Sequence, residues 1–160
     1  MLALRFAAVL GLVFWIGGLA ALGAIAAPVL FEVLGARGPD GRALAGLVFG
    51  ETLSRFHLAA YACGGVVIAS LLVRAILGPR PRRFAVRLFV AVAMAGATAW
   101  SGLALVPRIQ AAQRTLGAAS ALPETDPRRV EFQRLHGLST SLQLVPLLGG
   151  LALIFFELKD

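Results

Sequence analysis

The side chains best suited to bind a ligand or a metal are two histidines and several polar residues at helical spacing. His136, Ser139 and Gln143 are three and four residues apart, so they share one face of a helix. His57 is the only other histidine in the chain. Two imidazoles on different helices can hold a haem iron from both sides, and with a carboxylate such as Glu32 they can hold a transition metal. This spacing is not diagnostic, and polar residues in membrane helices more often bond to a neighbouring helix, so we predict no cofactor and leave haem or a transition metal open.

These residues form part of a larger candidate polar cluster, which we expect at one level of the molecule, on the side away from both termini. Converging polar and charged side chains in a membrane protein commonly mark a site, although Arg and His at span ends also anchor helices at the lipid headgroups. We expect Glu32 to pair with Arg108, because an unpaired carboxylate near hydrocarbon is costly, and His136 to face the interior. The candidate polar cluster comprises Glu32, Arg55, His57, Arg108, Arg134, His136, Ser139 and Gln143.

Four long apolar segments must position this cluster. They cover about residues 6–34, 43–77, 84–116 and 128–157, and Gly- and Pro-containing breaks separate them. Each is long enough to cross a hydrocarbon layer of roughly 30 Å, which takes about 20 residues. Apolar residues make up 59% of the chain and charged residues only 14%, as expected for such spans. The sequence therefore predicts an all-α fold, an integral membrane four-helix bundle that forms a single four-span transmembrane domain over 1–160.

The charges predict how the spans are oriented. The net charge is +7, but the arginines lie beside the spans, so we expect no nucleic-acid partner. Arg74, Arg80, Arg82, Arg83 and Arg87 follow one another without an intervening acid. Short connections rich in Lys and Arg stay in the cytoplasm, which predicts a multi-pass protein of the cell membrane with cytoplasmic N- and C-termini.

Small residues predict how the helices pack, because lipid offers no hydrophobic drive for association and close backbone approach must replace it. We expect two stripes to make contacts within the bundle, with a homo-oligomer as the alternative use of the same surface. The stripes are Gly17, Ala20, Ala24 and Ala27 in the first span, and Gly65 and Ala69 in the second.

Short motifs distributed along the chain resemble a known family. They comprise Trp15, Gly17 and Gly18; Pro28 and Phe31; Pro107, Arg108 and Arg114; and His136. Their order and spacing are similar to the domain-of-unknown-function family of transmembrane protein 205-like (DUF4149-type) four-helix membrane proteins. A more distant likeness is to the copper-resistance D and four-helix protoporphyrinogen oxidase-like group, some of which use haem.

The nearer resemblance implies a four-span membrane protein without an established activity. The haem proteins of the distant group resemble one another in a histidine early in the first helix, and residues 4–7 of this chain contain none, so that ligand does not carry over. Gln143 also stands where the nearer family leads us to expect an asparagine.

We therefore predict a binding protein in preference to an enzyme. Its surroundings are the lipid bilayer, and its polar cluster would serve a small ligand, metal tolerance or contact with a membrane-protein partner. One alternative is a haem-binding or redox membrane protein, and another is a structural subunit of a membrane complex.

Overall fold

The computed structural model describes residues 1–78, 80–116 and 122–159, and within them the chain is helical and contains no β-strand. Two of the long helices each contain one π-helical turn, η1 or η2. All four long helices have the length and apolar composition of membrane spans, which confirms the predicted all-α fold and the predicted span-like helices. In chain order the elements are α1 (Leu2–Ala21), η1 (Leu22–Ala26), α2 (Ala27–Gly35), α3 (Pro39–Leu77), α4 (Phe84–Trp100), η2 (Ser101–Leu105), α5 (Val106–Leu116) and α6 (Pro127–Lys159).

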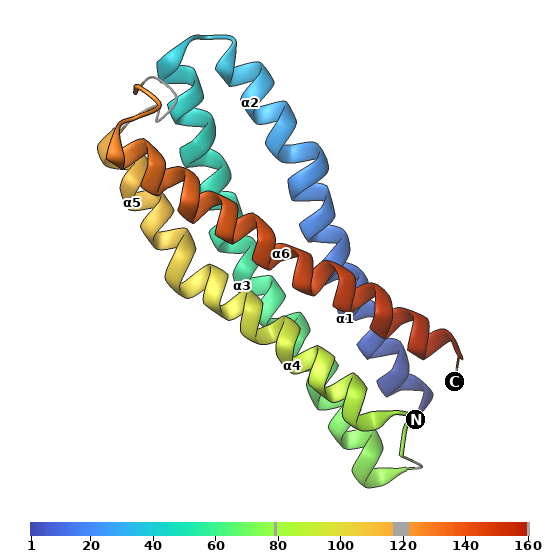
Figure 1. The fold of residues 1–160 in the computed structure, drawn as a ribbon. Coiled ribbons are helices and arrows are strands. Elements are labelled where there is room, and N and C mark those ends of the chain that lie inside the picture. Colours follow the sequence, from blue (N-terminus) through green and yellow to red (C-terminus); the bar gives the residue numbers. More distant parts are fainter. Residues whose placement is uncertain (79, 117–121, 160) are drawn as a thin grey trace.

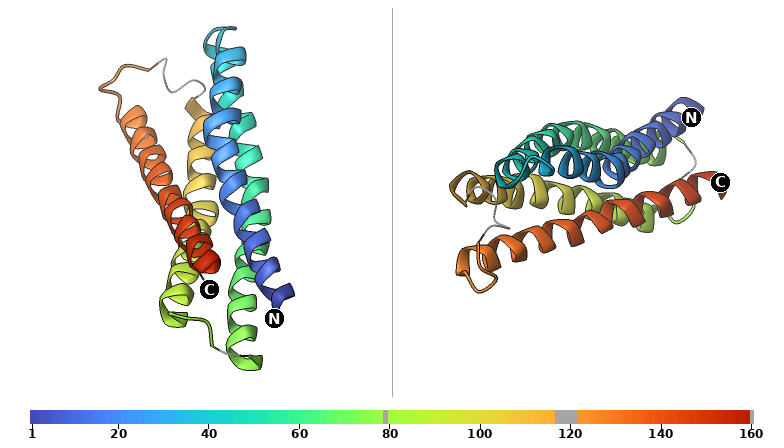
Figure 2. Two further views of the ribbon diagram at one scale, coloured as in Figure 1. Left: turned by 90° about the vertical axis from the view of Figure 1, so that its right-hand side faces the viewer. Right: turned by 90° about the horizontal axis from the view of Figure 1, so that it is seen from above.

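The helices pack as an elongated bundle with two distinct ends. Both termini lie at one end with the connection between α3 and α4, and we call this the terminal end (Figure 1). The opposite end, where α2 turns into α3 and α5 finishes, is called the loop end. α1 and α2 pack along α3, while α6 packs mainly on α4 and α1. Toward the loop end α6 diverges from α2, as two views agree (Figures 1 and 2).

The core lies where α1, α3, α4 and α6 approach most closely. Its largest buried side chain is that of Trp15, and Leu12, Met94 and Leu153 pack in the same cluster. A Cβ added to Gly64 would lie 3.2 Å from the Trp15 ring, so this glycine lets α3 approach α1 closely.

Five of the six residues in the predicted small-residue stripes do not make these contacts, so the prediction is wrong for them, whereas Ala27 is half-buried. Gly17, Ala20, Ala24, Gly65 and Ala69 are exposed on the outside of the bundle. Within the described residues, a Cβ on either glycine would meet no atom within 4 Å. Helical spacing identifies a stripe of small residues, but every face of a membrane helix is apolar, so spacing alone does not show which face meets a neighbour.

Charged residues bound a charge-free band on all four long helices. The band comprises residues 6–31, 56–73, 88–107 and 135–156, which contain no Asp, Glu, Lys or Arg. On α3 such a stretch rises roughly 30 Å at about 1.5 Å per residue, which matches the thickness of the hydrocarbon layer. Residues 39–54 of α3 continue beyond the band, so the loop end projects out of the layer.

Candidate binding cavity at the loop end

A cavity of about 520 Å³ lies between α2, α3, α5 and α6 at the loop end. It extends from residues inside the charge-free band, such as Gly23 and Gln143, to residues beyond it, such as Gln113, so it straddles the expected boundary between lipid and water. Its apolar wall includes Phe31, Phe49, Leu53, Val106, Ile109 and Phe132, and its polar side chains are Arg42, Gln110, Gln113, His136, Ser139, Thr140 and Gln143. Such a mixture suits a molecule with an apolar body and a polar group.

Two glycines of α3 make room for the glutamines that line one wall. A Cβ at Gly46 would lie 2.5 Å from Gln113 Nε2, and a Cβ at Gly50 would lie 3.3 Å from Gln110 Cγ. Gln110 Nε2 donates to Ser54 Oγ at 3.0 Å, which fixes that amide. Gln113 Oε1 is buried, and within the described part of the chain it accepts no hydrogen bond. A buried acceptor left in this way costs about 1–3 kcal/mol, so a donor from a ligand or water would be favourable here.

The facing wall comes from α6. His136 is exposed at the mouth, with its ring stacked on Phe132 at 6.1 Å between centroids. Ser139 is buried, and its Oγ lies 3.4 Å from Ser101 Oγ on η2. Gln143 is half-buried one turn deeper. Three polar side chains of α6 that share a helical face therefore line this cavity.

A second cavity, of about 10 Å³, lies deeper in the bundle and has room for roughly one water molecule. His57, Thr98, Ser101 and Gln143 are among its lining residues, and Gln143 also lines the larger cavity. His57 Nδ1 donates to the carbonyl oxygen of Leu53 at 2.7 Å, since a carbonyl can only accept, and Nε2 is left as the acceptor of the neutral ring. Thr98 Oγ1 is buried without a hydrogen-bond partner among the described residues.

The π-helical turn η2 shapes the space around this buried histidine. A Cβ at Gly102 would meet Tyr61 Oη, and it would lie 2.6 Å from His57 Cδ2. Glycine therefore allows both rings of α3 to pack directly against the backbone of η2.

Half of the predicted polar cluster does not join either cavity. Glu32, Arg55, Arg108 and Arg134 are exposed, at the loop-end limit of the charge-free band. Arg55 Nε instead forms an exposed ion pair with Glu51 Oε1 at 3.1 Å. The predicted pair between Glu32 and Arg108 is not found among the described residues, because both side chains extend outward.

The two histidines line different cavities, His57 the small one and His136 the large one. This arrangement does not favour a metal or a haem iron held by both. Among the described residues, no three His, Cys, Asp or Glu side chains are grouped as ligands of a metal ion.

The residues that carry the family resemblance are spread over the bundle. Pro28, Phe31 and His136 line the large cavity. Trp15 is in the core, and a Cβ at Gly18 would lie 2.5 Å from the Phe56 ring. The remaining residues, Gly17, Pro107, Arg108 and Arg114, are exposed.

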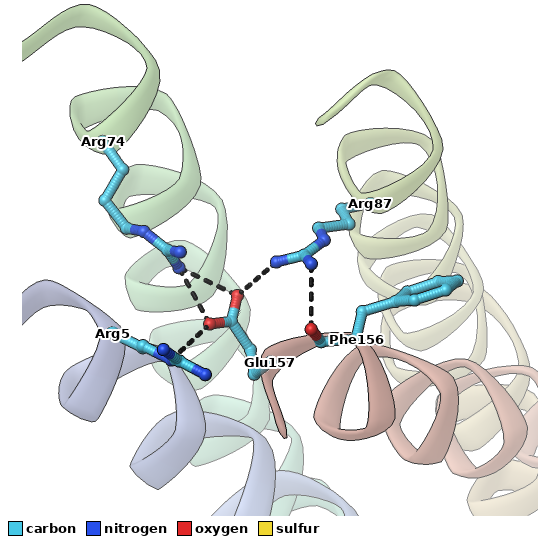
Figure 3. A network of polar contacts seen from close by, with 5 residues as sticks. All are labelled: Arg5, Arg74, Arg87, Phe156 and Glu157. Carbon is cyan, nitrogen blue, oxygen red and sulfur yellow. Dashed lines mark hydrogen bonds and ion pairs between the residues drawn. The ribbon is translucent and has the colours of Figure 1, made fainter. Parts of the chain in front are cut away.

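A buried ion network closes the terminal end (Figure 3). Glu157 Oε1 accepts from Arg74 Nη1 at 2.8 Å and from Arg87 Nη1 at 3.0 Å, while Arg5 Nε lies 3.3 Å from Oε2. Arg87 Nη2 also donates to the carbonyl oxygen of Phe156 at 2.9 Å. The network joins α1, α3, α4 and α6 through one carboxylate.

Sequence reasoning missed Glu157 and treated Arg74 and Arg87 only as orientation signals. A signal was present, however. Apart from the C-terminal residue, Glu157 is the only acid at the terminal end of the chain, and it faces a group of arginines without an acid of its own. The distribution of charged residues between the two ends of the spans identifies the arginines, but it does not show which of them are buried.

Comparison with known proteins identifies one matching family. The sequence model of a family described as Domain of unknown function (DUF4149) matches residues 10–118, which is more than half of the chain. No curated protein and no solved structure matches the chain. The matched region covers most of α1 and all of α2 to α5, and thus one side of the large cavity with its two glutamines. This four-helix chain belongs to the DUF4149 family.

Proposed function

We propose that this membrane protein binds a small, neutral amphipathic molecule in the loop-end cavity. The observation that carries the proposal is Gln113 Oε1, a buried acceptor in the wall of a cavity of about 520 Å³ that receives no donor from the described residues. A ligand hydroxyl or N–H group would supply the missing donor. Among the described residues that line the cavity, Arg42 alone carries a full charge, and its side chain is exposed, so the interior offers no charged partner to an ion and favours a neutral ligand.

The divergence of α6 from α2 supports access from the side. α2 is not among the main packing partners of α6, and the cavity lies between these two helices. Their facing side chains, Phe31 and Phe132, are aromatic. An apolar tail would remain beside lipid there, while the polar group reaches the amide of Gln113.

The proposal can be tested with a photoreactive long-chain alcohol, which has one hydroxyl and an apolar tail. Labelling of protein in nonionic micelles, mapped by mass spectrometry, should concentrate on cavity residues such as Phe132 and Gln143. Gln113→Leu should reduce this labelling about fivefold or more, since one hydrogen bond contributes about 1 kcal/mol or more. The control Gln133→Leu makes the same chemical change at an exposed position outside the cavity, and it should leave labelling unchanged.

Two results would contradict the proposal. One is labelling spread evenly over the lipid-facing surface, and the other is equal loss in the two variants. Thr140→Phe provides a second test of the same site. Because Thr140 lines the cavity and is exposed, the larger side chain would fill the space proposed for the ligand without disturbing the core.

We further propose that the protein lies in the cell membrane with the terminal end in the cytoplasm, so that the cavity opens outside the cell. The support is the arginine-rich connection at that end, because short basic connections remain cytoplasmic. A reporter fused to the C-terminus that is active only in the cytoplasm should be active, and a reporter active only outside the cell should be silent. The reverse pattern would contradict this orientation.

A further inference from the structure

The terminal end carries more positive charge than its one buried carboxylate balances. Glu157 faces three guanidinium groups, which leaves two positive charges over. Arg80, Arg82 and Arg83 follow in the adjacent connection. Across residues 1–78, 80–116 and 122–159, neither Arg80 nor Arg82 pairs with a carboxylate. Strong positive charge therefore remains at the limit of the charge-free band.

Two neighbouring hollows at this end share Arg80 and Pro81. The first, of about 440 Å³, is lined by four guanidinium-bearing side chains, those of Arg5, Arg74, Arg80 and Arg82. The second, of about 720 Å³, runs along the outer face of α4. A basic hollow thus adjoins a largely apolar one at Arg80 and Pro81.

The apolar hollow follows the helix into the hydrocarbon layer. Phe84, Leu88, Phe89 and Val92 line it, and they lie on one face of α4. From Phe84 to Val92 the helix rises about 12 Å, of which about 6 Å, from Leu88 to Val92, lies within the charge-free band. The Arg80 guanidinium carbon lies 5.1 Å from the centre of the Phe84 ring, which orients the charged group above this face.

We propose that these hollows bind an anionic phospholipid. Its phosphate would lie between Arg80 and Arg82, within the field of Arg5 and Arg74, and one acyl chain would follow α4. Arginine suits this role because its planar group donates two parallel hydrogen bonds to a phosphate. Basic pockets between helices at the membrane boundary commonly bind anionic headgroups, and the apolar continuation favours a lipid over a free anion.

Lipid retention in micelles tests the proposal. Phosphatidylglycerol and phosphatidylcholine are titrated separately into the purified full chain in nonionic detergent, and bound lipid is counted by native mass spectrometry. The wild type should retain phosphatidylglycerol when this lipid is present at a low mole fraction. Retention of phosphatidylcholine should require a mole fraction at least tenfold higher. Arg80→Gln/Arg82→Gln should weaken that retention roughly 30-fold, since each arginine near an anionic lipid contributes about fivefold. Equal retention of the two lipids by the wild type would overturn the proposal.

The control Arg55→Gln/Arg108→Gln removes the same charge at the loop end and should retain phosphatidylglycerol like the wild type. An equal loss in the control would overturn the site, because overall charge would then explain the selectivity. Glycerol phosphate has a headgroup but no acyl chain, so it should not raise the melting temperature of the protein at a concentration at which phosphatidylglycerol does. A rise equal to that with phosphatidylglycerol would overturn the lipid assignment in favour of a free anion.

A separate substitution tests the position of the acyl chain. It also tests the proposal if the double arginine variant does not fold. The Phe89 side chain is 73% exposed, so Phe89→Ser leaves the core and every arginine unchanged. It should weaken retention of phosphatidylglycerol severalfold. Unchanged retention would overturn the placement of the chain along α4.

Discussion

Replacing Glu157 by Gln tests whether one buried carboxylate holds the terminal end together. The change keeps the size and one acceptor oxygen but removes the charge that faces Arg5, Arg74 and Arg87. Glu157 is 5% exposed and Arg87 2%, whereas Arg5 is 34% exposed. Removing one partner of a buried pair costs about 3–5 kcal/mol, and an exposed pair contributes about 0–1 kcal/mol. We expect Glu157→Gln to lower the free energy of unfolding by about 3 kcal/mol, and Arg5→Gln by less than about 1 kcal/mol.

The charge balance also predicts a non-additive double variant. Without the carboxylate, three guanidinium groups repel one another in a confined space. Arg74→Gln alone should cost about 2–3 kcal/mol, but in the Glu157→Gln background it also relieves that repulsion. The double variant should therefore be more stable than the two single effects predict, by at least about 1 kcal/mol.

Unfolding with increasing SDS in mixed micelles, followed by helical circular dichroism, gives the free energies. Glu51→Gln is the matched control, because it removes the carboxylate of the exposed Glu51–Arg55 pair, and it should change stability by less than about 0.5 kcal/mol. The reasoning is refuted if Glu157→Gln costs no more than Glu51→Gln, or if the effects of the two single variants simply add.

Three further predictions concern the cavities and the start of α6. In the same unfolding assay, Gly102→Ala should cost about 1–3 kcal/mol, since its Cβ would lie 2.6 Å from a buried imidazole ring, whereas Gly96→Ala, with no described neighbour within 4 Å, should be neutral or stabilising. Thr98→Val should cost about 1 kcal/mol because it removes a partner of the water expected in the small cavity, and a gain in stability would show that the cavity is dry. Hydrogen bonds from Arg128 lower the pKa of Asp126, so this contact is fully formed above the usual pKa of an aspartate and is lost as the pH falls through the lowered value. The Arg128 backbone amide resonance should follow that titration, and Asp126→Asn should abolish it.

The four long helices could be predicted from the sequence because hydrocarbon imposes two simple requirements. A span must be apolar over its full length, and its backbone must bond to itself. The predicted segment over 84–116 is found as a continuous run of α4, η2 and α5. Which faces meet could not be predicted, as Gly17 on the outside and Gly64 in the core illustrate. Both lie among apolar residues, and only the path of the neighbouring helix distinguishes them.

The candidate site could be predicted in part for the same reason. Helical spacing placed His136, Ser139 and Gln143 on one face, and all three line the large cavity. Gln110 and Gln113 could not be singled out, because they lie beyond the charge-free band, at the end of the predicted segment over 84–116. Their relation to α3 depends on how far that helix projects from the membrane, and the length of an apolar run does not report this.

The network around Glu157 also has a mechanical consequence for the whole of α6. It fixes this helix at one end to α1, α3 and α4, whereas the other end diverges from α2. From Glu157 to Phe132 the helix is about 37 Å long, and between these residues it also packs on η2 and α5. A change of about 5° in its angle at the carboxylate would displace Phe132 by about 3 Å. The width of the opening between α6 and α2 at the loop end thus depends on an angle that is held at the opposite end of the bundle.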